Sequence, residues 1–166
     1  MDLFVLFGIA TGAGLAAWLV RDRLPSLVTI TSRSMLPALE PGALVPLLPV
    51  RRSRPPARGD VVVIQSAELG RRVVKRIIGL PGEVITVVAG VVRVNGSVLA
   101  EPWLVRSGGR SARLVAPAGS YVVLGDNRAE SADSRSWRQP YVPRQALRGR
   151  VVRPSWGPWA SRAGRP

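Results

Sequence analysis

One lysine and a small set of serines are the side chains of this sequence best suited to covalent chemistry. The chain contains no histidine and no cysteine, which excludes Ser-His-Asp and Cys-His catalysis. The ten acidic residues are scattered and form no Asp-Thr/Ser-Gly motif, which argues against an aspartic protease. A Ser-Lys pair is the remaining option for a hydrolase, with the serine as nucleophile and a neutral lysine as base.

Lys75 is the only lysine among the 24 basic residues, and it lies in the stretch "RRVVKRII" over residues 71–78. Arginine stays protonated near neutral pH, whereas burial lowers the pKa of a lysine and lets it act as a base. Strand alternation places Val73, Lys75 and Ile77 on one face, and Val74, Arg76 and Ile78 on the other. The apolar neighbours of Lys75 suit a desolvated base, and an ordinary strand lysine is the alternative.

The candidate nucleophile, Ser34, belongs to the stretch "TSRSMLPALEPG" over residues 31–42. A turn directly after a strand would expose the Ser34 hydroxyl and its backbone amide. Ser32 could then supply a second donor to a developing oxyanion. The alternative is that both serines only cap a proline-bounded bend.

A third polar segment, "GDNRAESADSR" over residues 125–135, follows another valine-rich run. Asp133 and Arg135 could form an ion pair that holds this loop. Without further context the segment could equally be a solvated turn.

Composition limits the other function classes. The 166 residues suffice for one domain with a hydrophobic core, and the net charge of +14 suits an anionic membrane surface or nucleic acid. A solvated basic surface, produced by a bias toward arginine, is the alternative. We expect no nucleic-acid partner because no basic stripe alternates with aromatic residues. We expect no zinc site or other cofactor because histidine and cysteine are absent.

An uncharged apolar segment covers residues 3–20 and predicts one transmembrane helix. A cleaved signal peptide fits less well because no basic residue precedes the segment, and a buried core helix is a further alternative. Arg21 and Arg23 follow the segment, so the positive-inside rule would place the domain in the cytoplasm. Five tryptophans are candidates for contact with the membrane interface or for the core. They are Trp18, Trp103, Trp137, Trp156 and Trp159.

Short valine-rich runs between glycine and proline turns predict a mainly β, antiparallel domain. Asn95-Gly96 is a strong signal for a two-residue hairpin. The expected strands cover residues 27–31, 43–48, 60–66, 71–78, 83–88, 90–94, 97–100, 120–126 and 149–154. The predicted organisation is an anchor with its flank at 1–24, a β-rich domain at 25–155 and a tail at 156–166.

Four segments in this order resemble the type I signal peptidases, the Ser-Lys membrane proteases of family S26. They read "SRSMLPAL", "RGDVVVI", "VVKRIIGLPGE" and "GDNRAESADSR", and the resemblance covers roughly residues 27–154. It implies an antiparallel β domain of the signal-peptidase type behind one N-terminal transmembrane helix. It departs from the usual Ser-Met-x-Pro-Thr pattern at Ala38, and the chain has no room for the large extra β-domain of the bigger relatives.

The resemblance also implies roles for individual residues. Ser34 would be the nucleophile and Lys75 the general base, with Ser32 in the oxyanion hole and Ser131 orienting the lysine. Asp133 would pair with Arg135 and Arg76. The remaining implied residues are Gly125, Asp126 and Asn127 for the shape of the site, and Ile30, Thr31, Met35, Leu39 and Val74 for substrate contact.

The resulting expectation is a membrane-anchored endopeptidase that removes signal peptides after small residues of the Ala-X-Ala type. Its partners would be precursor proteins and the lipid bilayer. The resemblance places the catalytic domain outside the cytoplasm, against the rule applied to Arg21 and Arg23. Three alternatives stay open: a maturation protease for one cognate precursor, a self-cleaving Ser-Lys repressor, and a basic domain that binds membrane or RNA without catalysis.

Overall fold

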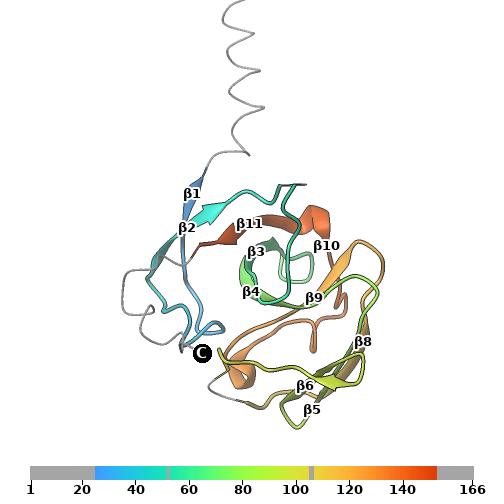
Figure 1. The fold of residues 1–166 in the computed structure, drawn as a ribbon. Helices are drawn as coiled ribbons and strands as arrows, with labels where there is room; N and C mark the ends of the chain where they lie inside the picture. Colours follow the sequence, from blue (N-terminus) through green and yellow to red (C-terminus); the bar gives the residue numbers. More distant parts are fainter. Residues whose placement is uncertain (1–24, 52, 105–106, 153–166) are drawn as a thin grey trace, which may run out of the picture.

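Valine-rich strands, each only a few residues long, form two antiparallel sheets in the computed structural model (Figure 1). The structure describes residues 25–51, 53–104 and 107–152. The larger sheet has seven strands in the order β1-β2-β11-β3-β4-β9-β10, and the smaller has four in the order β7-β6-β5-β8. The strands of the larger sheet are β1 (Ser26–Thr29), β2 (Leu44–Leu48), β3 (Val61–Gln65), β4 (Arg72–Gly79), β9 (Ser120–Leu124), β10 (Val142–Pro143) and β11 (Leu147–Val151). Two short 3₁₀ helices, η1 (Arg128–Glu130) and η2 (Arg144–Ala146), lie in the loops beside β9 and β10.

The smaller sheet is formed by the segment of the chain between β4 and β9. Its strands are β5 (Val84–Val88), β6 (Val91–Val94), β7 (Ser97–Val98) and β8 (Ala112–Val115). The hairpin predicted at Asn95-Gly96 is confirmed, since Val94 pairs with Ser97 across these two residues. Both turn residues have positive φ, 49° and 89°, which is the geometry of the turns that fit the twist of a hairpin.

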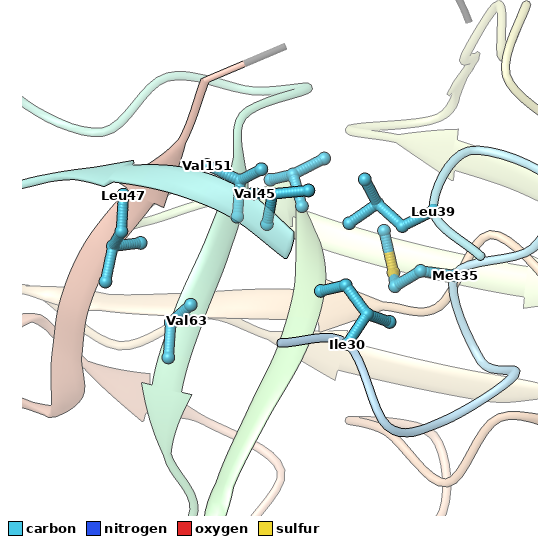
Figure 2. Close-up of a cluster of buried hydrophobic side chains, with 8 residues drawn as sticks. Ile30, Met35, Leu39, Val45, Leu47, Val63 and Val151 are labelled. Atoms are coloured by element: carbon cyan, nitrogen blue, oxygen red, sulfur yellow. The ribbon is translucent and has the colours of Figure 1, made fainter. Parts of the chain in front are cut away.

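Three clusters of buried side chains form the core. The first lies beside β1, β2 and the turn after β1, and Figure 2 shows it. The second fills the opposite face of the larger sheet around Val62, Ile77 and Val123. The third joins the two sheets, with Val122 and Leu124 of β9 packed against Ile85 and Val87 of β5. The smaller sheet is therefore packed against β9, the strand that leads into the polar loop 125–135.

Most of the predicted strands are confirmed, with ends that differ by one to three residues. The expected strand 27–31 ends at Thr29, and the expected strand 149–154 is β11, which begins at Leu147. β8 and β10 were not predicted. Both are short, four and two residues, so neither gives a clear alternating pattern.

Two of the five tryptophans lie within the described residues, and both pack inside the domain. Trp137 is 8% exposed in the second core cluster, and half-buried Trp103 packs against the third. Trp137 is therefore a core residue, as the alternative expected, whereas membrane contact of the partly exposed Trp103 stays a prediction. Trp18, Trp156 and Trp159 lie outside the described residues.

The predicted membrane span at residues 3–20 also lies outside the described residues. Within residues 25–51, 53–104 and 107–152, no helix has the length and apolar character to cross a bilayer.

Candidate active site

Ser34 and Lys75 both line one groove, whose volume is about 370 Å³. Residues 28–34, from β1 and the turn after it, form one wall, and residues 71–75 at the start of β4 form the other. Among residues 25–51, 53–104 and 107–152, β1 pairs only with β2, and β9 joins β4 only from Arg76 onward. Each wall of the groove therefore carries a strand edge without a neighbouring strand.

Lys75 has the environment expected of a neutral base. Its side chain is 3% exposed, and its Nζ donates a hydrogen bond of 3.0 Å to Ser131 Oγ. Burial lowers the pKa of Lys75 from 10.5 to about 8. Asp133 acts in the opposite direction, and the charge of Arg135 adds to the lowering.

The predicted alternation along β4 is confirmed on both faces. Val73 and Ile77 pack on the second core cluster, whose member Val62 is the cross-strand neighbour of Lys75. Val74 packs on the first cluster and Ile78 belongs to the third. The lysine is therefore desolvated by the apolar residues that share its face.

The Ser34 turn is tied to the loop that carries Ser131. The backbone N–H of Asn127 donates to the Ser34 carbonyl at 3.0 Å, and Asn127 Nδ2 donates to the Arg33 carbonyl at 3.3 Å. The Ser34 and Ser32 hydroxyl oxygens lie 3.2 Å apart. Within the described part of the chain, the Ser34 N–H makes no hydrogen bond, and Ser34 makes none to Lys75.

Gly125 lies between the two halves of the site. A Cβ atom at this position would be 2.2 Å from Ser131 Oγ and 2.6 Å from the Ser34 carbonyl oxygen. Only glycine therefore lets the Ser34 turn and Ser131 approach each other this closely.

The predicted ion pair of Asp133 and Arg135 is present and buried. Arg135 Nε donates to Asp133 Oδ1 at 2.8 Å and its Nη2 donates to Oδ2 at 2.9 Å. Burial raises the pKa of Asp133, but the hydrogen bonds and charge of Arg135 outweigh it and hold that pKa below its ordinary value. Asp133 also accepts from the Gly125 N–H at 3.0 Å, so this pair fixes the glycine beside Ser131.

Arg76 does not pair with Asp133, so that part of the expectation is wrong. Its guanidinium binds both carboxylate oxygens of Asp126 and donates to the Gly59 carbonyl at 2.8 Å. Asp126 lies directly after Gly125 at the end of β9, and Arg76 pairs with Leu124 across the sheet. Arg135 and Arg71, rather than Arg76, are the arginines that lower the pKa of Lys75.

A buried pair that sequence reasoning missed joins the smaller sheet to this loop. Arg128 is 1% exposed and binds Glu101 through both Nη atoms, while its Nε donates to the Gly125 carbonyl at 2.9 Å. Trp103, close to Glu101 in the sequence, lies under Arg76, 4.6 Å from Cζ to the ring centroid. Arg128 lies in the polar segment 125–135 that stands out in the sequence. Its partner Glu101 lies 27 residues earlier, so the sequence did not indicate the pair.

The five residues assigned to substrate contact divide into two groups. Ile30, Thr31 and Val74 line the groove, whereas Met35 and Leu39 do not line it and lie in the first core cluster together with Ile30 (Figure 2). Met35 and Leu39 contact the same cluster as Ile30, so the structure places them behind the groove wall. The roles of all five in substrate binding stay predictions.

A metal ion has no evident binding site in the described ranges, where no three His, Cys, Asp or Glu side chains converge. Among the described residues, the groove instead offers a buried lysine, the two serines Ser32 and Ser34, and the unbonded backbone N–H of Ser34, while Ser131 contacts the lysine amine. Such a set can abstract a proton from a hydroxyl and stabilise an oxyanion without a cofactor.

Comparison with known proteins places the chain in a family. The family model "Signal peptidase, peptidase S26" matches residues 2–156. A signal peptidase I of Leptolyngbya laminosa is 39% identical over 137 residues, covering 76% of this chain and 66% of that protein. Signal peptidase I T of Bacillus subtilis strain 168 is 33% identical over 136 residues, covering 75% and 70%. This chain thus spans about two thirds of the length of these relatives.

A solved structure is similar as well. The signal peptidase I of Enterococcus faecalis V583 is 31% identical, with a TM-score of 0.54 that covers 60% of this chain and 98% of the other. The mainly β, antiparallel fold therefore matches a signal peptidase structure.

Proposed function

The chain belongs to the signal peptidase family, peptidase S26, and on this premise we propose that it is a serine endopeptidase that removes signal peptides from secreted precursors. Ser34 is the nucleophile and Lys75 the general base in this proposal. The observation that carries it is the buried Lys75 amine, whose pKa is about 8, in hydrogen-bond contact with Ser131 and in one groove with Ser34.

In the first step, neutral Lys75 takes the hydroxyl proton of Ser34 as Ser34 Oγ attacks the scissile carbonyl carbon. The hydrogen bond missing between Ser34 and Lys75 in the free protein would form with substrate bound, as catalytic contacts often tighten at that stage. The Ser34 N–H, which bonds to none of the described residues, and the Ser32 hydroxyl, 3.2 Å from the Ser34 hydroxyl, would donate to the oxyanion, and one such donor typically contributes about 3–4 kcal/mol.

In the second step, protonated Lys75 gives its proton to the leaving amine, and the C–N bond breaks to leave an ester on Ser34. Neutral Lys75 then takes a proton from water, whose oxygen attacks the ester carbon. The ester C–O bond then breaks as Ser34 Oγ regains the proton from Lys75, and the product leaves as a carboxylic acid that loses its proton to solvent. Ser131 keeps the amine oriented through both steps, and the Asp133–Arg135 pair keeps Ser131 in place through Gly125.

The proposed substrate conformation is an extended peptide between the two free strand edges, because unpaired edges bind extended chains through backbone hydrogen bonds. The wall residues Ile30, Thr31 and Val74 would surround the side chains next to the scissile bond. Cleavage after small residues, Ala-X-Ala in type, remains part of the proposal.

We place the β domain at 25–155 on the extracytoplasmic side of the cell membrane, with residues 1–24 as a single-pass anchor. The 18 uncharged residues 3–20 support an anchor. Protease added to intact cells should then degrade the domain. Full protection until the cells are lysed would instead favour the cytoplasmic location that Arg21 and Arg23 suggest.

Incubation of the purified full chain in detergent with a panel of secretory precursors tests the proposed activity. Mass spectrometry of the products should find one new N-terminus directly after an Ala-X-Ala sequence, and the Ser34→Ala variant should give none. Cleavage of a single precursor in the panel would favour a dedicated maturation protease. Binding of anionic vesicles without any cleavage would favour the non-catalytic alternative.

A further inference from the structure

The groove carries an excess of positive charge that the proposed catalytic steps do not use. Arg33, Arg71 and Arg72 line it, and Glu130 is its one carboxylate. Glu130 lies 3.5 Å from Arg33, so the charge of that arginine is partly balanced. Arg71 and Arg72 are exposed, and neither pairs with a carboxylate in the part of the chain that the structure describes.

The two unbalanced arginines lie at the end of the β4 wall, at a fixed spacing from the base. Arg71 immediately precedes β4, and Lys75 follows it by four positions. Because a strand advances about 3.3 Å per residue, the backbone positions of Arg71 and Lys75 are separated by roughly 13 Å along the groove. An extended peptide beside the same edge advances equally, so Arg71 lies about four substrate residues from the bond that Ser34 attacks.

Two further observations place the charge of these arginines within the groove. Both residues line it, and the charge of Arg71 helps lower the pKa of Lys75. The strand edge beside them has no neighbouring strand, so a bound peptide would hold its side chains within reach of the guanidinium groups.

We propose that Arg71 and Arg72 recognise an acidic side chain of the precursor, about four residues from the scissile bond. This inference rests on the proposed peptidase function and adds a preference about charge to it. A guanidinium group can bind a carboxylate through two parallel hydrogen bonds. This geometry suits the arginines to recognise a carboxylate at one position of the substrate. A basic side chain at the same substrate position would be repelled.

A peptide series tests the proposal, with the full chain in detergent. The parent peptide carries Ala-X-Ala and neutral flanks, and single Asp, Asn or Lys residues replace positions three to five on either side of the scissile bond. On one side, Asp should exceed Asn in kcat/KM by about 2- to 30-fold, because each of the two exposed ion pairs contributes about 0.2–1 kcal/mol. The preference should appear mainly in KM and fall in 0.5 M salt.

The double variant Arg71→Gln/Arg72→Gln should bring the Asp/Asn ratio close to one. Arg113→Gln is the matched control, because Arg113 is exposed on β8 of the smaller sheet, outside the groove, and it should leave the ratio unchanged. The assays are run at pH 9.5, above the pKa of Lys75, so that loss of the Arg71 charge changes the protonation of the base little.

The outcomes separate the two proposals. If no peptide is cleaved by the unmodified chain, the proposed peptidase function fails. If peptides are cleaved with no difference between Asp and Asn at any position, the charge preference is wrong. A preference for Asp that survives in the double variant would also overturn it, since other residues would then be responsible.

Discussion

Lys75 Nζ and Ser131 Oγ lie 3.0 Å apart, in a hydrogen bond that joins β4 to the loop after β9 across 56 residues of sequence. The lysine is almost fully buried, so this hydroxyl is the one side chain of the described residues that receives a hydrogen bond from its amine. A lysine has four rotatable side-chain bonds, and a fixed acceptor holds the lone pair of the neutral amine in one direction.

Ser131→Ala should therefore impair catalysis more than folding. Loss of a hydrogen bond to a charged or catalytic amine costs about 1.5–3 kcal/mol, which corresponds to a decrease in kcat/KM of about 10- to 100-fold. The pH at which the rate is half-maximal should also shift, because the amine loses its acceptor. Ser136→Ala is the control, since among the described residues the hydroxyl of Ser136 forms hydrogen bonds only with the backbone of Asp133 in the same loop. Equal losses in both variants would assign Ser131 a merely structural role.

Gly125→Ala should disrupt the site because the new methyl group would overlap Ser131 Oγ and the Ser34 carbonyl. We expect a loss of about 1–3 kcal/mol in the free energy of unfolding and a large loss of kcat. Ser131→Ala in the same chain should restore only part of the stability, because the overlap with Ser34 remains. Gly119→Ala is a control with positive φ and free space, so backbone strain should lower its stability while its kcat is retained. A fully active Gly125→Ala variant would show that the close approach is not required.

Glu101→Gln should destabilise the domain by about 3–5 kcal/mol, because it leaves the buried Arg128 without its counter-charge. Glu83→Gln is a matched control, since its partner Arg58 is 24% exposed and Glu83 is 18% exposed. The control should lose clearly less stability in urea unfolding. If the two variants lost the same amount, burial would not distinguish the two pairs.

Lys75→Met should stabilise the domain at neutral pH. The pKa of Lys75 is 10.5 ordinarily and about 8 in the folded chain, so the unfolded chain binds this proton more tightly. The stability of the native chain therefore rises with pH between about 8 and 10.5, and the Lys75→Met variant lacks this rise. The advantage of the variant at pH 7 over that at pH 10.5 should be on the order of 3 kcal/mol, from about 1.4 kcal/mol per pH unit. A difference between the two proteins that did not change with pH would contradict the lowered pKa.

Much of both sheets could be predicted because their strands are valine-rich runs with clear turn signals, such as Asn95-Gly96 in the smaller sheet. The four segments that resemble signal peptidases also identified Ser34, Lys75 and Ser131, which the structure brings into or beside one groove. Alternation alone predicted which side chains of β4 share a face, because strand geometry points successive side chains to opposite faces.

The Asp133–Arg135 pair was predicted because its two residues are close in sequence, but the buried pairs between distant residues could not be predicted in the same way. Asp126 and Asp133 lie seven positions apart in one loop, so the partner of Arg76 depends on where β9 ends beside β4. Glu101 contacts Arg128 because the smaller sheet packs against the larger sheet. Such contacts depend on packing between elements distant in sequence, and no local pattern encodes them.

The pH dependence of kcat/KM on a signal-peptide substrate is the most direct test of the central claim, that neutral Lys75 is the base for Ser34. The unmodified chain should gain activity as the pH rises and reach a plateau above a midpoint near 8, where the pKa of Lys75 lies. Lys75→Arg should be as inactive as Lys75→Ala at every pH, because arginine keeps its proton. A rate that increased from pH 8 down to pH 5, or substantial activity in Lys75→Arg, would contradict the account.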